Sequence, residues 1–172
     1  MNPEDMNLFP RSTGAEFSDC KTYRYKLWRT WDKNKKPVMF LMLNPSVADD
    51  VKNDPTVERC ERRARLTGAG GLLVGNIFAL RSTDPVALYN ADDPVGPLND
   101  NAIMEMAGEA EMVVCAWGNH GAYAGRGKAV ARLLAGAGIL MYHFGLTVSK
   151  QPRHPLYVSY MVQPTRWNRG LL

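Results

Sequence analysis

Polar side chains recur at the ends of the apolar segments of this chain, where folding could gather them into one site. Asn44 and Ser46 follow the first apolar segment, and Asn76 lies within the second. Asn119 follows the third segment, and His154 comes shortly after the fourth. An Asn amide offers both a hydrogen-bond donor and an acceptor, and His can act as a general acid or base. These residue types suit the recognition or catalysis of a polar ligand.

Acidic residues after the first apolar segment add carboxylates to this set. Asp49, Asp50 and Asp54 follow Asn44 in the same loop. Carboxylates can stabilise a developing positive charge, or bind Mg²⁺ together with a phosphate-bearing substrate. Structural interpretations remain open beside these: Asp54 precedes Pro55, as a helix N-cap would, and the other two acids suit a solvated loop.

The first apolar segment, residues 38–43, has the composition of a strand that is buried on both faces. Pro45 cannot continue the hydrogen-bond ladder, so the strand should end near Asn44. Three further segments of this kind occupy residues 72–78, 112–116 and 139–144.

Helical patterns alternate with these strands. The expected helices begin at Asp54, begin at Asn99 or Asp100, and run through residues 128–134. This alternation predicts an α/β fold, a three-layer α/β/α sandwich around a central four-stranded parallel sheet. Since ligands bind beyond the carboxyl ends of the strands in such sheets, the polar residues at those ends should converge.

The segment before the first buried strand, residues 21–31, alternates basic and polar residues with aromatic ones. Together with the turn at residues 32–36, it predicts a hairpin with the buried strand and an antiparallel strand at the edge of the sheet. Basic residues are usual on an exposed edge, although such a face could also bind nucleic acid. We expect a single domain over residues 1–172, with a loose arm at residues 1–19 and a basic tail at residues 164–172.

Composition narrows the functional classes. The 172-residue chain has a net charge of +4, which permits a polyanionic partner without requiring one. It contains no apolar run of membrane-spanning length and no signal-peptide pattern, so we expect a cytoplasmic protein without membrane contact. Cys20, Cys60 and Cys115 lie far apart and lack metal-type spacing, which favours reduced thiols. We expect no metal site and no cofactor.

Four segments, in the same order along the chain, resemble the domain of unknown function 1643 family and, more distantly, the uracil-DNA glycosylase superfamily. They are VMFLMLNPS at residues 38–46, GGLLVGNIFALR at 70–81, VVCAWGNHGA at 113–122 and RHPLY at 153–157. The first segment resembles the glycosylase strand that ends in Asp-Pro or Asn-Pro. The next is similar to the strand whose Asn reads the uracil edge, the third to the Trp-Gly-Ser/Asn segment, and the last to the motif that begins with His-Pro.

This resemblance implies a uracil-DNA glycosylase-like fold and an enzyme that acts on an N-glycosidic bond in DNA or in a nucleotide. Cleavage of that bond builds positive charge on the sugar and negative charge on the base. The catalytic residues that the resemblance implies are Asn44 and His154, and we expect Asp49, from its position in the loop after the first strand, to supply the missing carboxylate. The implied substrate-binding residues are Pro45, Ser46, Asn76, Arg81, Asn119 and Arg153, and the implied partner is DNA or a nucleotide.

Two departures from the superfamily pattern keep a second interpretation open. Asn44 stands where the efficient uracil enzymes carry an Asp that activates water. Leu156 and Tyr157 stand where the final motif continues with a Ser-Pro pair that grips the DNA backbone. Asn76 and His154 could also satisfy only local hydrogen bonds. The alternative is therefore a non-catalytic nucleic-acid or nucleotide-binding module on the same fold.

Overall fold

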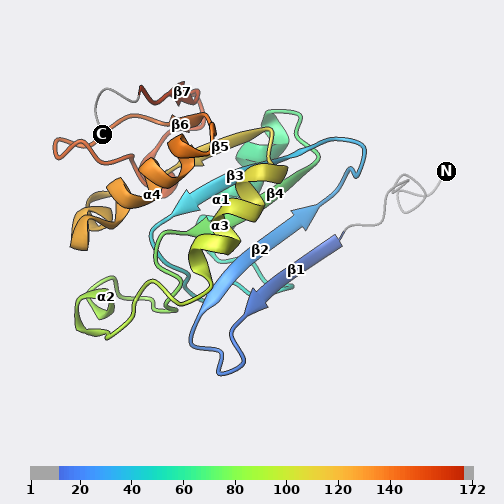
Figure 1. Cartoon of the computed structure of the whole chain (residues 1–172). Helices are drawn as coiled ribbons and strands as arrows, with labels where there is room; N and C mark the ends of the chain where they lie inside the picture. Colours follow the sequence, from blue (N-terminus) through green and yellow to red (C-terminus); the bar gives the residue numbers. More distant parts are fainter. Residues whose placement is uncertain (1–11, 169–172) are drawn as a thin grey trace.

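The computed structural model describes residues 12–168, which form one seven-stranded sheet with helices on both of its faces (Figure 1). The strands are β1 (Ser12–Phe17), β2 (Arg24–Thr30), β3 (Pro37–Met42), β4 (Gly71–Asn76), β5 (Met112–Cys115), β6 (Met141–His143) and β7 (Thr165–Arg166). Their order across the sheet is β1-β2-β4-β3-β5-β6-β7. The four central strands β4, β3, β5 and β6 are parallel, and antiparallel strands complete both edges.

Several helical segments connect the strands. They are α1 (Pro55–Leu66), α2 (Ala87–Asn90), α3 (Asn99–Glu109), α4 (Arg126–Gly136) and the 3-10 helices η2 (Asn119–Gly125) and η3 (Pro155–Tyr157). Successive residues of β3 point into different cores because side chains alternate along a strand. Met39 packs in one core with Ile103 of α3, whereas Phe40 packs in the other with Val57 of α1. The predicted α/β class is confirmed.

The predicted hairpin between residues 21–31 and the buried strand is wrong. Strand β2 pairs with β4, where Leu27 lies opposite Val74, and β4 in turn separates β2 from β3. The connection from β2 to β3 therefore crosses the start of β4. Gly70 permits this crossing, because a Cβ at that position would lie 2.2 Å from the carbonyl oxygens of Asp32 and Lys35. Strand β2 is also not an edge strand, since β1 covers its other side.

The described parts of both terminal segments contain a strand that the sequence did not suggest. The loose arm was expected at residues 1–19, but Ser12–Phe17 form β1, paired with β2. Within the expected basic tail, Thr165–Arg166 form β7 against β6, and Trp167 is buried. The remaining parts of those two predictions, residues 1–11 and 169–172, lie outside the described residues.

One of the two predicted helix caps is confirmed. Asp54 caps α1, with its carboxylate accepting a hydrogen bond from the Val57 N–H at 2.8 Å. Helix α3 starts without a side-chain cap. Asn99 is fully buried there, and its Nδ2 donates instead to the carbonyl oxygens of Asn76 and Ile77. Asn99 therefore fixes the backbone at the end of β4 and does not cap its own helix.

None of the helices between residues 12 and 168 has the length and apolar character needed to cross a membrane. The same residues contain no group of three or more His, Cys, Asp or Glu side chains arranged to hold a metal ion.

Candidate functional site

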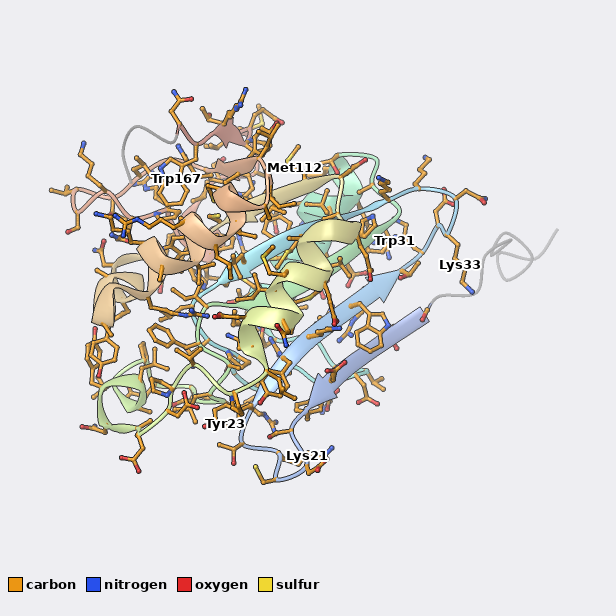
Figure 2. The ribbon with its side chains drawn as sticks, in the orientation of Figure 1. Lys21, Tyr23, Trp31, Lys33, Met112 and Trp167 are labelled. Atoms are coloured by element: carbon orange, nitrogen blue, oxygen red, sulfur yellow. The ribbon has the colours of Figure 1, made fainter. Side chains whose placement is uncertain are left out.

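A cavity of about 670 Å³ lies where the central strands end, a size typical of small-molecule sites. Because β2 runs antiparallel to β4, the start of β2 near Tyr23 lies where the central strands end. Trp31 and Lys33 lie toward the opposite end of the strands (Figure 2). Six of the nine predicted site residues line the cavity: Asn44, Ser46, Asn76, Asn119, Arg153 and His154. Topology thus brings together side chains that are more than a hundred residues apart in the sequence.

Asn44 presents an acceptor to the cavity. Its Nδ2 donates to the carbonyl oxygens of Ser82 at 3.0 Å and of Leu80 and Pro45 at 3.3 Å. These bonds tie the end of β3 to the segment after β4, and they occupy the donor half of the amide. The Oδ1 atom has no hydrogen-bond partner among the described residues, so it can accept from a water or a ligand.

Asn76 presents the opposite half of its amide. It is buried, and its Oδ1 accepts a hydrogen bond from Nη2 of Arg24 at 3.3 Å. Its Nδ2 has no hydrogen-bond partner in the described structure and can donate to a ligand. An Asn amide that reads the edge of a base would offer both a donor and an acceptor. In Asn76 only the donor remains free, because the protein itself uses the oxygen.

Arg24 is a residue of the cavity that the sequence did not indicate. It is only 2% exposed, and its Nη1 donates to the carbonyl oxygen of Ala48 at 2.9 Å. Burial lowers the pKa of Arg24 to about 10, which leaves the guanidinium charged at neutral pH. Alternation along the strand groups Arg24 with Lys26 and Trp28, which suggests an exposed face. The only signal for a buried role was a basic residue within an aromatic-rich segment, and that signal is typical of edge strands as well.

His154 is held as a neutral ring. Its Nδ1 accepts a hydrogen bond from the Leu156 N–H at 3.3 Å, which a protonated Nδ1 could not do. Burial lowers the pKa of His154, while the nearby Asp54 carboxylate opposes that shift. The resulting tautomer carries its proton on Nε2 and is a hydrogen-bond donor.

Asp54 is the one acidic residue in the described lining of the cavity. Its cap at the start of α1 fixes the carboxylate, and its charge acts on both Arg24 and His154. Asp54 thus serves as a helix cap and as the carboxylate of the site, two interpretations that the sequence had offered as alternatives.

The remaining predicted residues of the lining lie closer to solvent. Asn119 and Arg153 are exposed, and Ser46 is half-buried. The Oδ1 atom of Asn119 accepts from the Thr147 hydroxyl at 2.6 Å, which leaves its Nδ2 as a donor. The backbone of Arg153 is fixed by its N–H bond to the Gly145 carbonyl at 3.0 Å.

Three predicted residues are not brought to the cavity. Asp49 closes its own loop, because its carboxylate accepts from the N–H groups of Val51 and Lys52, and these bonds lower its pKa. Arg81 points toward the β1–β2 turn, where it donates to the Lys21 carbonyl. Pro45 is buried, and its carbonyl oxygen accepts from the Ser82 N–H at 2.9 Å. All three stabilise the loops around the site.

Comparison with known protein families gives one match. The family model described as "Protein of unknown function (DUF1643)" matches residues 24–156. That span begins at Arg24 and includes every residue of the cavity lining except Tyr157. No curated protein and no solved structure matches the chain.

Proposed function

This chain belongs to the DUF1643 family, and from its cavity we propose that the protein recognises a nucleobase and hydrolyses an N-glycosidic bond in DNA or in a nucleotide. One observation carries this proposal: Asn44, Asp54 and His154 line a single cavity as an acceptor, a carboxylate and a neutral donor. The site carboxylate is Asp54 in place of the predicted Asp49, whose carboxylate is engaged in its own loop.

These three groups match the charges that develop during hydrolysis. The sugar becomes positive as the bond to the base breaks, and the Asp54 carboxylate stabilises that charge. Asn44 Oδ1 accepts a hydrogen bond from the attacking water, whose oxygen bonds to the anomeric carbon. The base leaves with the electron pair of the broken bond, and His154 donates a hydrogen bond to it from Nε2. Asn44 orients the water without deprotonating it, since an amide is not a base at neutral pH. The water therefore loses its proton to the solvent once it has bonded to the sugar, and the released base takes up a proton from the solvent.

The sequence resemblance supports the same proposal. Three of the segments that resemble uracil-DNA glycosylase motifs contain Asn44, Asn76 and His154, which all line the cavity. Parallel strands enclosed by two helical layers agree with the expected glycosylase-like architecture. We therefore propose a uracil-DNA glycosylase-like fold together with this activity.

Base release tests this function directly. Purified protein would be incubated with uracil-, hypoxanthine- and mismatch-containing oligonucleotides and with free nucleotides, and released bases would be separated by chromatography. We expect release from at least one substrate and a loss of about 10²-fold or more in His154→Gln. His143→Gln, outside the described cavity lining, is the matched control and should keep its activity. Absence of release from the whole panel would refute the proposed activity.

A second candidate is a non-catalytic nucleotide or nucleic-acid-binding module. Two of the proposed catalytic groups also have structural roles, which favours this candidate. Asp54 caps α1, and the Asn44 Nδ2 anchors a loop. The net charge of +4 is compatible with such a partner. Such a module would bind its ligand without releasing a base. Its affinity would fall as the salt concentration rises, and the slope would reflect the number of phosphate contacts. Binding that is indifferent to salt would exclude a phosphate-dependent module.

A further inference from the structure

Arg24 places a buried positive charge in the wall of the cavity without a carboxylate in contact. It is 2% exposed, and none of the ion pairs among the described residues includes it. Its two identified partners, the Ala48 carbonyl and Asn76 Oδ1, are neutral acceptors. Its Nε is buried and has no hydrogen-bond partner in the described structure. A buried charge of this kind is costly unless another group compensates it.

The wall around Arg24 is rich in donors. Asn76 contributes a free Nδ2, and Ser46 and Thr56 contribute hydroxyl groups. Thr56 and Val57 belong to the first turn of the 12-residue helix α1, whose N-terminus favours negative charge. Asp54 caps that helix and opposes an anion, but Arg24 and Arg153 give the charged side chains of the lining a positive balance.

The sheet order gives the cavity two different ends. Arg24 and Asn76 come from the neighbouring strands β2 and β4. His154 lies beside Gly118, which follows β5, three strands away from β2 and hence roughly 14 Å across the sheet. Asn44 follows β3 between these ends. The His154 end also contains the exposed aromatic ring of Tyr157, on which a base can stack.

We propose that the ligand of this cavity is a free nucleoside monophosphate, with its phosphate at the Arg24–Asn76 end and its base at the His154 end. The inference rests on the proposed function, since it takes the ligand to be a nucleotide, and it places the scissile bond near Asn44. A terminal phosphate monoester can reach a side chain as buried as Arg24. A phosphodiester within a strand cannot, because the nucleotides on both of its sides would have to enter the cavity with it.

Binding measurements separate this ligand from its alternatives. Isothermal titration would compare the ribonucleoside and deoxyribonucleoside 5′-monophosphates with the matching nucleosides, inorganic phosphate and dinucleotides joined by one phosphodiester. We expect at least one monophosphate to bind about tenfold or more tightly than its nucleoside, because charge-assisted hydrogen bonds to phosphate are strong. The same monophosphate should bind more tightly than the dinucleotides, and inorganic phosphate should compete with it.

Variants assign the effect to Arg24. Arg24→Gln should bring the ratio of monophosphate to nucleoside affinity close to one, whereas Arg132→Gln, an exposed position on α4 outside the described lining, should leave it unchanged. If Arg24→Gln does not fold, the wild-type ratios decide the question together with Ser46→Ala, a half-buried position two residues before Ala48 that should lower the ratio. Equal binding of nucleoside and monophosphate, tighter binding of the dinucleotides, no binding of any monophosphate, or an unchanged ratio in a folded Arg24→Gln protein would overturn the inference.

The two proposals fail in different ways. Tight binding of a monophosphate without release of its base would preserve the ligand and remove the N-glycosidase. Release of base from oligonucleotides or nucleosides, with no gain in affinity from a terminal phosphate, would preserve the N-glycosidase and remove this ligand.

Discussion

Asn44 and Asn76 show how single side chains acquire fixed roles in this site. The donor half of Asn44 is bonded to backbone carbonyls, and the acceptor half of Asn76 is bonded to Arg24. Each amide therefore shows a ligand only one kind of group, and its orientation is set by the protein. Because these side chains are already oriented, little side-chain entropy is lost when a ligand binds.

The anchoring of Asn44 makes a specific prediction for Asn44→Asp. This change introduces a carboxylate, and it replaces a donor by a carboxylate oxygen that faces the carbonyls of Leu80 and Ser82. We expect the free energy of unfolding to fall by about 1–3 kcal/mol in urea denaturation at neutral pH. Asn119→Asp is the control, because Oδ1 of Asn119 already acts as an acceptor. An Asn44→Asp protein as stable as the wild type would contradict the assigned amide orientation.

His154 predicts a pH dependence with a definite sign. Burial lowers its pKa from 6.5, so the folded protein binds this proton less readily than the unfolded chain. The stability that His154 contributes is present above pH 6.5 and is lost as the pH falls from there through the lowered pKa. We expect NMR titration of the His154 ring between about pH 5 and 8 to give a midpoint below 6.5.

The control is a comparison of unfolding free energies across the same pH range. Burial also lowers the pKa of His143, so the wild-type slope contains both residues. His154→Gln should flatten part of that slope and leave the part due to His143. An identical slope in the variant, or an NMR midpoint above 6.5, would rule out a neutral His154 held by its surroundings.

At the scale of elements, helix α1 joins two parts of the site. Its first residues line the cavity, while Arg59 and Arg63 bind carbonyl oxygens of the segment that follows His154. Arg63 is buried, donates to the carbonyls of Val158 and Ser159, and lies over the Phe144 ring. These bonds fix an irregular segment that has no strand partner of its own.

Arg63→Gln should therefore release that segment. We expect a loss of roughly 2–3 kcal/mol in unfolding free energy, because bonds to a charged donor are lost in a buried place. Arg62→Gln is the control, because Arg62 lies one position earlier, is exposed and stacks on the Tyr160 ring, and its loss should change stability by less than about 0.5 kcal/mol. Hydrogen exchange at the amides of residues 156–162 locates the effect. Equal stability losses in the two variants would show that Arg63 does not hold the segment.

At the scale of the whole molecule, the insertion of β4 between β2 and β3 decides what reaches the cavity. It places β2 beside the end of β4, so that Arg24 meets Asn76. The insertion also requires the β2–β3 connection to pass over Gly70, whose N–H donates to the Lys36 carbonyl. In the predicted hairpin, Arg24 would have lain next to β3 and not next to β4.

Gly70→Ala tests this crossing. Its Cβ would collide with two backbone carbonyls at 2.2 Å, which side-chain rotation cannot relieve. We expect a loss of about 1–3 kcal/mol in the free energy of unfolding, measured with urea. Gly136→Ala, at a helical position with open space around it, should be neutral or slightly stabilising. A Gly70→Ala protein with wild-type stability would show that the connection does not cross there.

The sequence alone determined the elements with strong local signals. Continuous apolar segments predicted β3, β4, β5 and β6, and Asp54 before Pro55 predicted the start of α1. Polar residues at the strand ends predicted a shared site, because parallel strands place those ends at one edge whatever their order. Six of the nine predicted site residues follow from that rule.

Long-range packing set the strand pairing, the terminal strands and the direction of individual polar groups. The six-residue connection between β2 and β3 fits a hairpin equally well, and the sequence does not show that β4 pairs between the two strands. Arg24 reads as an exposed basic residue until that pairing buries it. Asp49 and Asp54 are both loop acids in the sequence, and only the fold turns one toward its own backbone and the other toward the cavity. Local composition specifies where strands and helices form, whereas long-range packing specifies which side chains share a site.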